Sequence, residues 1–173
     1  ATAEVAVGLM LACARRFVEG DRLTRAGEFN GWAPLFHRGH GVYGKTVGIV
    51  GAGRIGKRVA ATMMHGFGCE ILYHSRHDHV DWENDLGAGK VELGELLKRS
   101  DFISLHCPLS PDTRHLIDAD MLKLMKPTAV LVNTARGPVV DEAALYAALK
   151  AGQIAAAGFD VYENEPALTP GLA

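Results

Sequence analysis

Residues 46 to 56 read Thr-Val-Gly-Ile-Val-Gly-Ala-Gly-Arg-Ile-Gly, a short β-type run that leads directly into a Gly-x-Gly-x-x-Gly turn. A helical pattern follows, with apolar residues at helical spacing, and a second β-type run covers residues 70 to 74. In such a turn Gly51 allows the tight bend, Gly53 lets a pyrophosphate approach the backbone, and Gly56 permits close helix–strand packing. The free N–H groups at the helix start face the phosphates. The context favours a dinucleotide-binding βαβ unit over a plain structural turn.

The composition is that of a globular α/β domain. The 173 residues are 48% apolar and 22% charged, and the formal net charge is −2. This charge and the lack of like-charge runs argue against nucleic-acid and anionic-membrane partners. Three scattered cysteines predict neither a disulfide framework nor a metal site, so we expect a reducing, cytoplasmic location. The apolar run 5–14 is too short to span a membrane and lacks the pattern of a secretory signal.

Strand-like and helix-like segments alternate along the rest of the chain. The expected helices are a short one around Leu93 to Leu97, one from Asp118 through Met125, and one over 142–150 that Asp141 caps and Gly152 ends. The expected strands are 102–106, 129–133 and 154–161. Continuously apolar strands separated by helices predict a Rossmann-type, doubly wound parallel sheet of the α/β class, covered on both faces. Its ligand is expected at the carboxyl ends of the strands.

The first 44 residues have a different character. Residues 3 to about 27 are expected to form one helix that is apolar on two sides, with Val5 and Phe17 on one side and Met10 on the other. Residues 29–44 form an irregular connector with exposed-looking aromatics, for which ordinary loop packing is the alternative to a contact surface. We expect residues 1–44 to be a homodimer arm, since such a helix needs cover from a partner subunit or from sequence absent here. Residues 45–173 are expected to be the dinucleotide-binding domain.

The motifs after the predicted strands resemble those of one family. Residues 44–56, 105–109 with Thr113, 131–141 and 158–166 are similar to the NAD(P)-binding domain of D-isomer-specific 2-hydroxyacid dehydrogenases, most closely the glyoxylate and hydroxypyruvate reductase branch. The resemblance covers nearly the whole chain. It implies hydride transfer between a nicotinamide cofactor and a small 2-oxo acid. Together with the glycine turn and the ends of the predicted strands, it gives the expected cofactor-binding residues: Gly51, Gly53, Arg54, Ile55, Gly56, Ser75, Arg76, Cys107, Pro108, Thr113, Thr134, Ala135, Arg136 and Asp160.

The same resemblance implies two catalytic residues. Arg136 would bind the substrate carboxylate and polarise the 2-oxo group, and Glu165 would support an imidazole that acts as general acid. Asp160 would lie near the nicotinamide. Each could instead be an ordinary surface charge or turn residue. The family's histidine follows in a Pro-His-Ile-Gly segment beyond Pro166, which this sequence does not contain. We therefore expect a truncated piece without its substrate domain, inactive alone, with His106 a structural or cofactor-side residue.

The end of the second strand bears on the choice of cofactor. It reads His74-Ser75-Arg76, with none of the acidic residues that usually accept from a ribose 2′-OH. Ser75 and Arg76 suit a 2′-phosphate, so NADP(H) is expected over NAD(H); the alternative is that Asp78 turns back to the ribose. Two other protein classes remain as alternatives. A nonenzymatic dinucleotide-sensing scaffold or corepressor would share this fold, while an S-adenosylmethionine methyltransferase is disfavoured by the missing acid.

Overall fold

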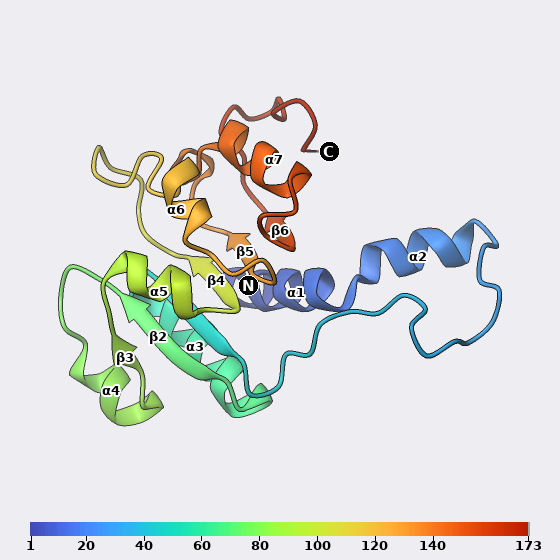
Figure 1. Ribbon diagram of the computed structural model, residues 1–173. Coiled ribbons are helices and arrows are strands. Elements are labelled where there is room, and N and C mark those ends of the chain that lie inside the picture. Colours follow the sequence, from blue (N-terminus) through green and yellow to red (C-terminus); the bar gives the residue numbers. More distant parts are fainter. Residues whose placement is uncertain (173) are drawn as a thin grey trace.

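The computed structural model describes residues 1–172 and contains a six-stranded sheet in which every neighbouring pair is parallel (Figure 1). The strand order is β3-β2-β1-β4-β5-β6, so successive strands are added on one side of β1 and then, from β4 onward, on its other side. The switch point, where α/β sheets bind ligands, therefore lies between β1 and β4. The predicted doubly wound sheet is therefore confirmed. The strands are β1 (Thr46–Val50), β2 (Glu70–His74), β3 (Gly89–Lys90), β4 (Phe102–Leu105), β5 (Val130–Asn133) and β6 (Ala156–Phe159).

Helices cover both faces of this sheet. On one face lie α1 (Thr2–Arg15), α3 (Arg54–Phe67) and α4 (Val80–Leu86). On the other lie α5 (Leu93–Arg99), α6 (Ala119–Lys123) and α7 (Glu142–Lys150). A short 3-10 helix, Gly137–Val139, follows β5. The sequence patterns did not predict α4 or the two-residue β3, because both are too short to show a period.

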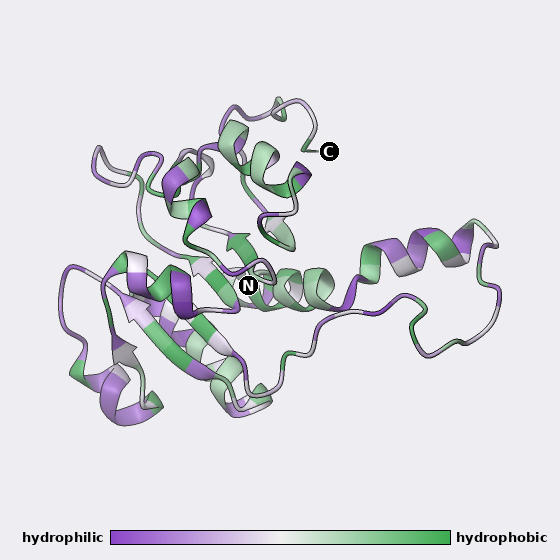
Figure 2. Ribbon diagram, viewed as in Figure 1, coloured by the Kyte–Doolittle hydropathy of each residue, from purple (hydrophilic) through white to green (hydrophobic). Residues whose placement is uncertain are grey.

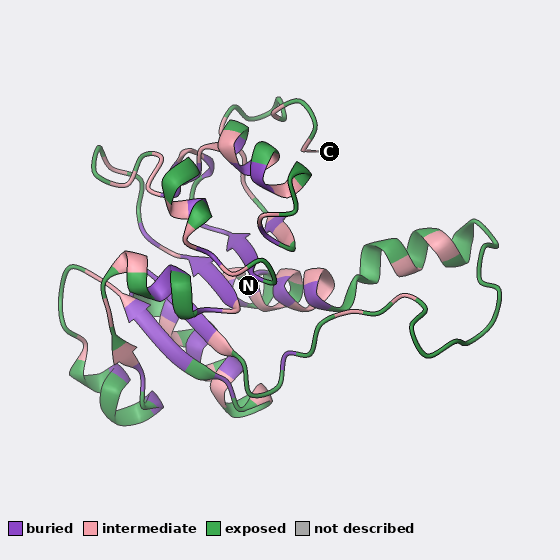
Figure 3. Ribbon diagram, in the orientation of Figure 1, coloured by how far each residue is buried: buried purple, intermediate pink, exposed green. Residues whose placement is uncertain are grey.

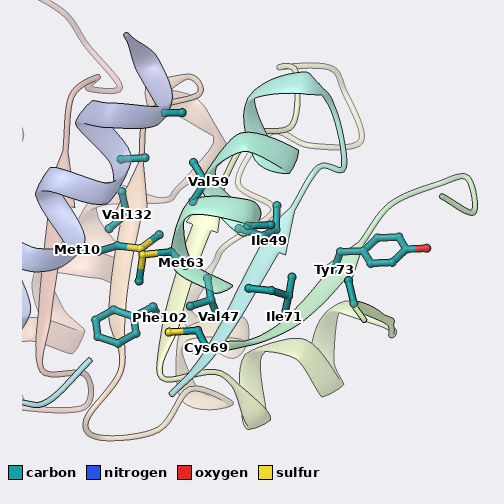
Figure 4. Packing of buried hydrophobic residues seen from close by; sticks show 14 of the residues in the cluster. Met10, Val47, Ile49, Val59, Met63, Cys69, Ile71, Tyr73, Phe102 and Val132 are labelled. Carbon is teal, nitrogen blue, oxygen red and sulfur yellow. The ribbon is translucent and has the colours of Figure 1, made fainter. Parts of the chain in front are cut away.

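The strands send alternate side chains to the two faces, although they read as continuously apolar. Val47 and Ile49 of β1 join the cluster under α1 and α3, whereas Val50 joins the opposite cluster under α5 and α7. Figure 4 shows the first cluster, where Met10 of α1 and Met63 of α3 meet the sheet. Each such side chain contributes about 1.5–3 kcal/mol when fully buried. Both faces of the strands are thus committed to core, and only their ends are free to bind a ligand.

The single helix predicted for residues 3 to 27 is wrong. Arg16 takes a left-handed conformation, with φ 56°, and separates α1 from α2 (Phe17–Arg25). The cause is a difference in burial: α1 buries Ala6, Met10 and Ala14 against the sheet, whereas α2 has no buried residue. Because α2 does not pack on the sheet, no buried contact keeps it collinear with α1.

The segment after α1 projects from the body as an arm, which we define as residues 17–41 (Figure 1). The stretch after α2 contains no helix or strand, as expected for the connector. The arm is almost entirely exposed (Figure 3), and apolar and polar residues alternate along α2 (Figure 2). Trp32 is 84% exposed and Leu35 is 76% exposed. The arm therefore presents several large apolar side chains to solvent.

Candidate dinucleotide-binding and active site

A cavity of about 390 Å³ lies at the carboxyl ends of β1, β2 and β4, beside the switch point of the sheet. Each strand end contributes to it: the turn at Gly51–Gly53, the segment His74–His77, and the segment His106–Pro108. The loop from Ser110 to Leu116 supplies the remaining wall. Of the predicted cofactor-binding residues, this cavity brings together Gly51, Gly53, Ser75, Arg76, Cys107, Pro108 and Thr113.

The glycine turn fits a backbone-approach role. Gly51 has φ 100°, and a Cβ there would lie 2.6 Å from the backbone nitrogen of Cys107. A Cβ on Gly56 would lie 2.6 Å from the carbonyl oxygen of Gly51, so α3 packs tightly on the turn. Gly53, by contrast, has open space around it and is the N-cap of α3, with no side chain that could cap the helix. The first N–H groups of α3 are therefore left for a ligand at this edge.

After β2, Arg76 lies at the cavity, whereas Asp78 is bound to another residue. Arg76 is exposed and lines the cavity. Asp78 accepts a hydrogen bond from Lys90 at 2.5 Å, and this contact holds the pKa of Asp78 below its ordinary value. The imidazole of His74 lies 3.1 Å from the carbonyl oxygen of Val91, to which it donates. The acidic side chain that would serve a ribose 2′-OH is thus paired with Lys90.

His106 and Cys107 are uncharged parts of the cavity wall. Burial lowers the pKa of His106 to about 4, so its ring is neutral at pH 7. Its Nε2 lies 2.9 Å from the hydroxyl of Ser104. Burial also raises the pKa of the Cys107 thiol. Both side chains are therefore uncharged at neutral pH, and the structural or cofactor-side role of His106 stays a prediction.

Thr113 shapes the loop that closes the cavity. Its hydroxyl donates to the carbonyl oxygen of Pro108 at 2.6 Å and accepts from the Ser110 N–H at 2.8 Å. These bonds fold residues 108–113 into a compact turn over the end of β4. Thr113 therefore fixes the wall formed by Pro108.

The loop after β5 is organised by a buried side chain, Asn133. Its Oδ1 accepts from the Ala135 N–H, and its Nδ2 donates to the carbonyl oxygen of Arg136, both at 3.0 Å. The Arg136 side chain is exposed and donates to the Ala135 carbonyl oxygen at 2.6 Å. Asn133 lies within one of the sequence motifs, but the motif predicts no role for it. The signal that could have revealed it is an Asn at a strand end, where its side chain commonly bonds the following backbone.

A second hollow brings the two predicted catalytic residues together. Arg136 and Glu165 line it with residues 137–138 and 161–164. The two loops touch at Gly137, where a Cβ would lie 1.9 Å from the carbonyl oxygen of Tyr162. Glu165 accepts a hydrogen bond from the Tyr162 N–H at 2.8 Å, which closes the turn that carries it.

The remaining predicted residues lie outside both hollows. Arg54 and Ile55 are exposed at the start of α3, and Asp160 is exposed just after β6. Thr134 and Ala135 are buried at the end of β5. The hydroxyl of Thr134 has no hydrogen-bond partner among the described residues. A buried polar atom of this kind is a candidate contact for a bound group.

Comparison with known proteins decides the family. Residues 7–171 match the family described as D-isomer specific 2-hydroxyacid dehydrogenase, NAD binding domain. The chain belongs to this family. The resemblance expected from the motifs is therefore confirmed, and so is a domain of the type that binds a nicotinamide dinucleotide.

Individual relatives agree with this assignment. The glyoxylate reductase of Thermococcus litoralis is 53% identical over 170 residues, which are 96% of this chain and 51% of that protein. The crystal structure of a glyoxylate reductase from Paecilomyes thermophila superposes with a TM-score of 0.89 at 45% identity, covering 99% of this chain and 51% of the other. The apo D-mandelate dehydrogenase of Rhodotorula graminis gives a TM-score of 0.89 at 36% identity, over 98% of this chain and 51% of that one. The chain thus spans about half the length of the relatives it matches.

Within residues 1–172 no helix has both the length and the apolar character needed to cross a membrane. The same residues contain no group of three or more His, Cys, Asp or Glu side chains arranged to hold a metal ion.

Proposed function

We propose that this chain is the dinucleotide-binding part of an NAD(P)-dependent dehydrogenase that reduces a small 2-oxo acid such as glyoxylate or hydroxypyruvate. The observation that carries the proposal is the arrangement of two hollows along one edge of the sheet. The cavity at β1, β2 and β4 suits a dinucleotide, and Arg136 and Glu165 lie at the adjoining ends of β5 and β6. The named glyoxylate reductases among the relatives support the substrate class.

The residues present fit a nicotinamide dinucleotide. Gly51 lets the turn pack against Cys107, Gly53 leaves open space for a pyrophosphate at the start of α3, and the unpartnered hydroxyl of Thr134 is available to a bound group. His74 to Arg76 would hold the ribose end, while Cys107, Pro108 and Thr113 form the wall. When bound, the nicotinamide supplies the hydride. Arg54, Ile55, Ala135 and Asp160 complete the proposed cofactor-binding set.

Arg136 and Glu165 are proposed to serve the substrate and its proton. A guanidinium can bind a carboxylate through two parallel hydrogen bonds while remaining charged at every working pH. Glu165 has one oxygen engaged by the Tyr162 N–H, and its other oxygen is available to orient an imidazole. Among residues 1–172 no histidine is hydrogen-bonded to Glu165. We therefore propose that the isolated chain does not turn over, because it lacks a positioned general acid.

Replacement of Arg136 by lysine in the full-length protein tests this role. We expect Arg136→Lys to lower kcat/KM for glyoxylate on the order of a hundredfold, since lysine cannot reproduce the bidentate geometry. Arg99→Lys, at an exposed ion pair with Glu70, is the matched control and should leave the kinetics unchanged. Equal kinetics for Arg136→Lys and the control would contradict the role of Arg136.

We further propose that NADP(H) is preferred over NAD(H). Arg76 lines the cavity, and Asp78, the alternative ribose ligand, is held by Lys90. A charge-assisted contact of Arg76 with a 2′-phosphate should add roughly tenfold to a hundredfold in affinity. Fluorescence titration should give tighter binding of NADPH than NADH, and Arg76→Ala should remove the difference. Arg58→Ala, an exposed arginine on α3, controls for net charge; equal affinities in the unmodified chain would refute the preference.

We propose a homodimer formed through residues 1–44. The arm exposes Phe17, Phe29, Trp32 and Leu35, and α2 buries no residue of its own, although a nine-residue helix is marginal in water without packing. A second copy of the chain would cover these side chains by a two-fold contact. Light scattering should therefore report a dimer, and the double change Trp32→Glu and Leu35→Glu should give a folded monomer. A monomeric unmodified protein at micromolar concentration would refute this interface.

We also propose a cytoplasmic location, because a reducing compartment suits the three free cysteines.

A further inference from the structure

Glu142 is a buried charged residue that the proposed chemistry does not use. It is the first residue of α7 and has no exposed surface. A carboxylate in such a place needs hydrogen bonds to replace water. Its Oε1 accepts from the Glu163 N–H at 2.7 Å, and its Oε2 accepts from the hydroxyl of Thr169. Glu142 also lies in the first turn of α7, where the helix dipole favours a carboxylate side chain.

The two partners of Glu142 lie on either side of Glu165. Glu163 precedes it by two residues, and Thr169 follows it by four. Between them, Glu165 closes its own turn by accepting from the Tyr162 N–H. The carboxylate of Glu142 therefore fastens both ends of the segment that presents Glu165 to the hollow shared with Arg136.

The same segment is connected to the wall of the dinucleotide cavity. The carboxylate of Glu163 lies 2.6 Å from Nε2 of His115 and 3.5 Å from Arg114. His115 holds a left-handed conformation, with φ 50°, and its N–H donates to the carbonyl oxygen of Pro138 at 2.8 Å. Its neighbours Thr113 and Leu116 line the cavity. A continuous set of contacts thus runs from the cavity wall, through Glu163, to Glu142.

We propose that Glu142 is a positioning residue that fixes the turn carrying Glu165 beside Arg136 and, through Glu163, ties this turn to the cavity wall. The inference rests on the proposed function for its catalytic consequence. Its structural part, the fastening of the turn, stands independently of any reaction.

Amide hydrogen exchange tests the fastening directly. In Glu142→Ala the Glu163 amide loses its acceptor and should exchange on the order of tenfold faster or more, the change expected from loss of one charge-assisted hydrogen bond. Glu142→Gln keeps a carbonyl oxygen for the Glu163 N–H and should restore slow exchange. Asp141→Ala is the matched control, because it removes the neighbouring cap of the same helix, which bonds the Ala144 N–H, and leaves Glu142 in place.

Kinetics of the full-length protein test the consequence. We expect Glu142→Ala to lower kcat for glyoxylate on the order of tenfold to a hundredfold, since small displacements of a catalytic group have effects of this size. The KM for the dinucleotide should stay within about twofold, because the glycine turn is untouched. Glu142→Gln should recover most of kcat, and Asp141→Ala should change thermal stability but not kcat.

The outcomes separate the two proposals. If the unmodified protein does not reduce 2-oxo acids but Glu142→Ala still frees the Glu163 amide, the proposed function fails and the fastening stands. Unchanged exchange at Glu163, or an equal loss of kcat in Glu142→Ala and Asp141→Ala, overturns the positioning role. If Glu142→Ala does not fold, Glu142→Asp keeps the charge at the helix start but is one methylene shorter, and should show the same fast exchange and reduced kcat.

Discussion

The two halves of the carboxyl edge of the sheet, one with the hollow beside β1, β2 and β4 and the other with the hollow after β5 and β6, are built in different ways. At the ends of β1 and β4 the chain relies on missing side chains, because glycine lets Gly51 approach Cys107 and lets α3 pack on the turn. At the ends of β5 and β6 it relies on side chains that bond backbone: Asn133 organises one loop and Glu142 fastens the next. The first half is therefore a closely packed backbone turn, suited to binding phosphate groups through backbone N–H groups. The second is an assembly of side chains whose geometry depends on each polar contact.

The contact between the two loops of the second half gives the largest expected effect. Gly137→Ala would put a Cβ 1.9 Å from the carbonyl oxygen of Tyr162, and both groups belong to backbone that cannot rotate away. We expect a loss of about 3 kcal/mol in the free energy of unfolding, at the upper end of the usual cost of overpacking, measured by urea denaturation. Gly53→Ala, in the first half, meets nothing within 4 Å and should leave stability nearly unchanged while weakening dinucleotide binding. Equal losses for the two variants would contradict the contrast.

The first half should respond to pH through His106. Its folded pKa of about 4 lies below the ordinary value of 6.5, so the unfolded chain takes up the proton first as pH falls. The stabilisation is complete above pH 6.5 and is lost as pH falls toward 4, by about 3 kcal/mol at most.

Chemical denaturation between pH 7 and pH 5 checks this, because most carboxylates remain ionised in that range. His106→Gln should flatten the slope, whereas His65→Gln, at an exposed position on α3, should keep it. A slope that persists in His106→Gln would assign the titration to another group.

The same contrast explains what the sequence could and could not predict. A tight backbone turn needs glycine at fixed spacing, so the motif alone predicts that Gly51 and Gly56 pack closely and that Gly53 stays open, as the structure shows. The strands other than the two-residue β3 were predictable because they lie within apolar runs of the sequence. Glu142 reads as an ordinary acidic residue in the first turn of a helix, and only the fold brings residues 163 and 169 to it. The break at Arg16 was equally invisible, because it depends on where the sheet ends beneath α1.

The smallest expected effect on the free energy of unfolding comes from two neighbouring buried side chains at the end of β5, Asn133 and Thr134. Asn133→Ala removes an acceptor for the Ala135 N–H and a donor for the Arg136 carbonyl oxygen. Leaving such groups unpaired costs about 1–3 kcal/mol, and we expect a loss near 2 kcal/mol in the free energy of unfolding.

Thr134→Val is the matched control, because the Thr134 hydroxyl is buried without a partner among the described residues. Replacing it by a methyl group of similar shape should leave stability within about 0.5 kcal/mol or raise it, since an unpaired buried hydroxyl is unfavourable. If Thr134→Val is as destabilising as Asn133→Ala, then its hydroxyl is paired in solution, and Thr134 serves the fold rather than a ligand. If only Asn133→Ala destabilises, Asn133 holds the loop, and the Thr134 hydroxyl takes no part in holding it and stays available to a bound group.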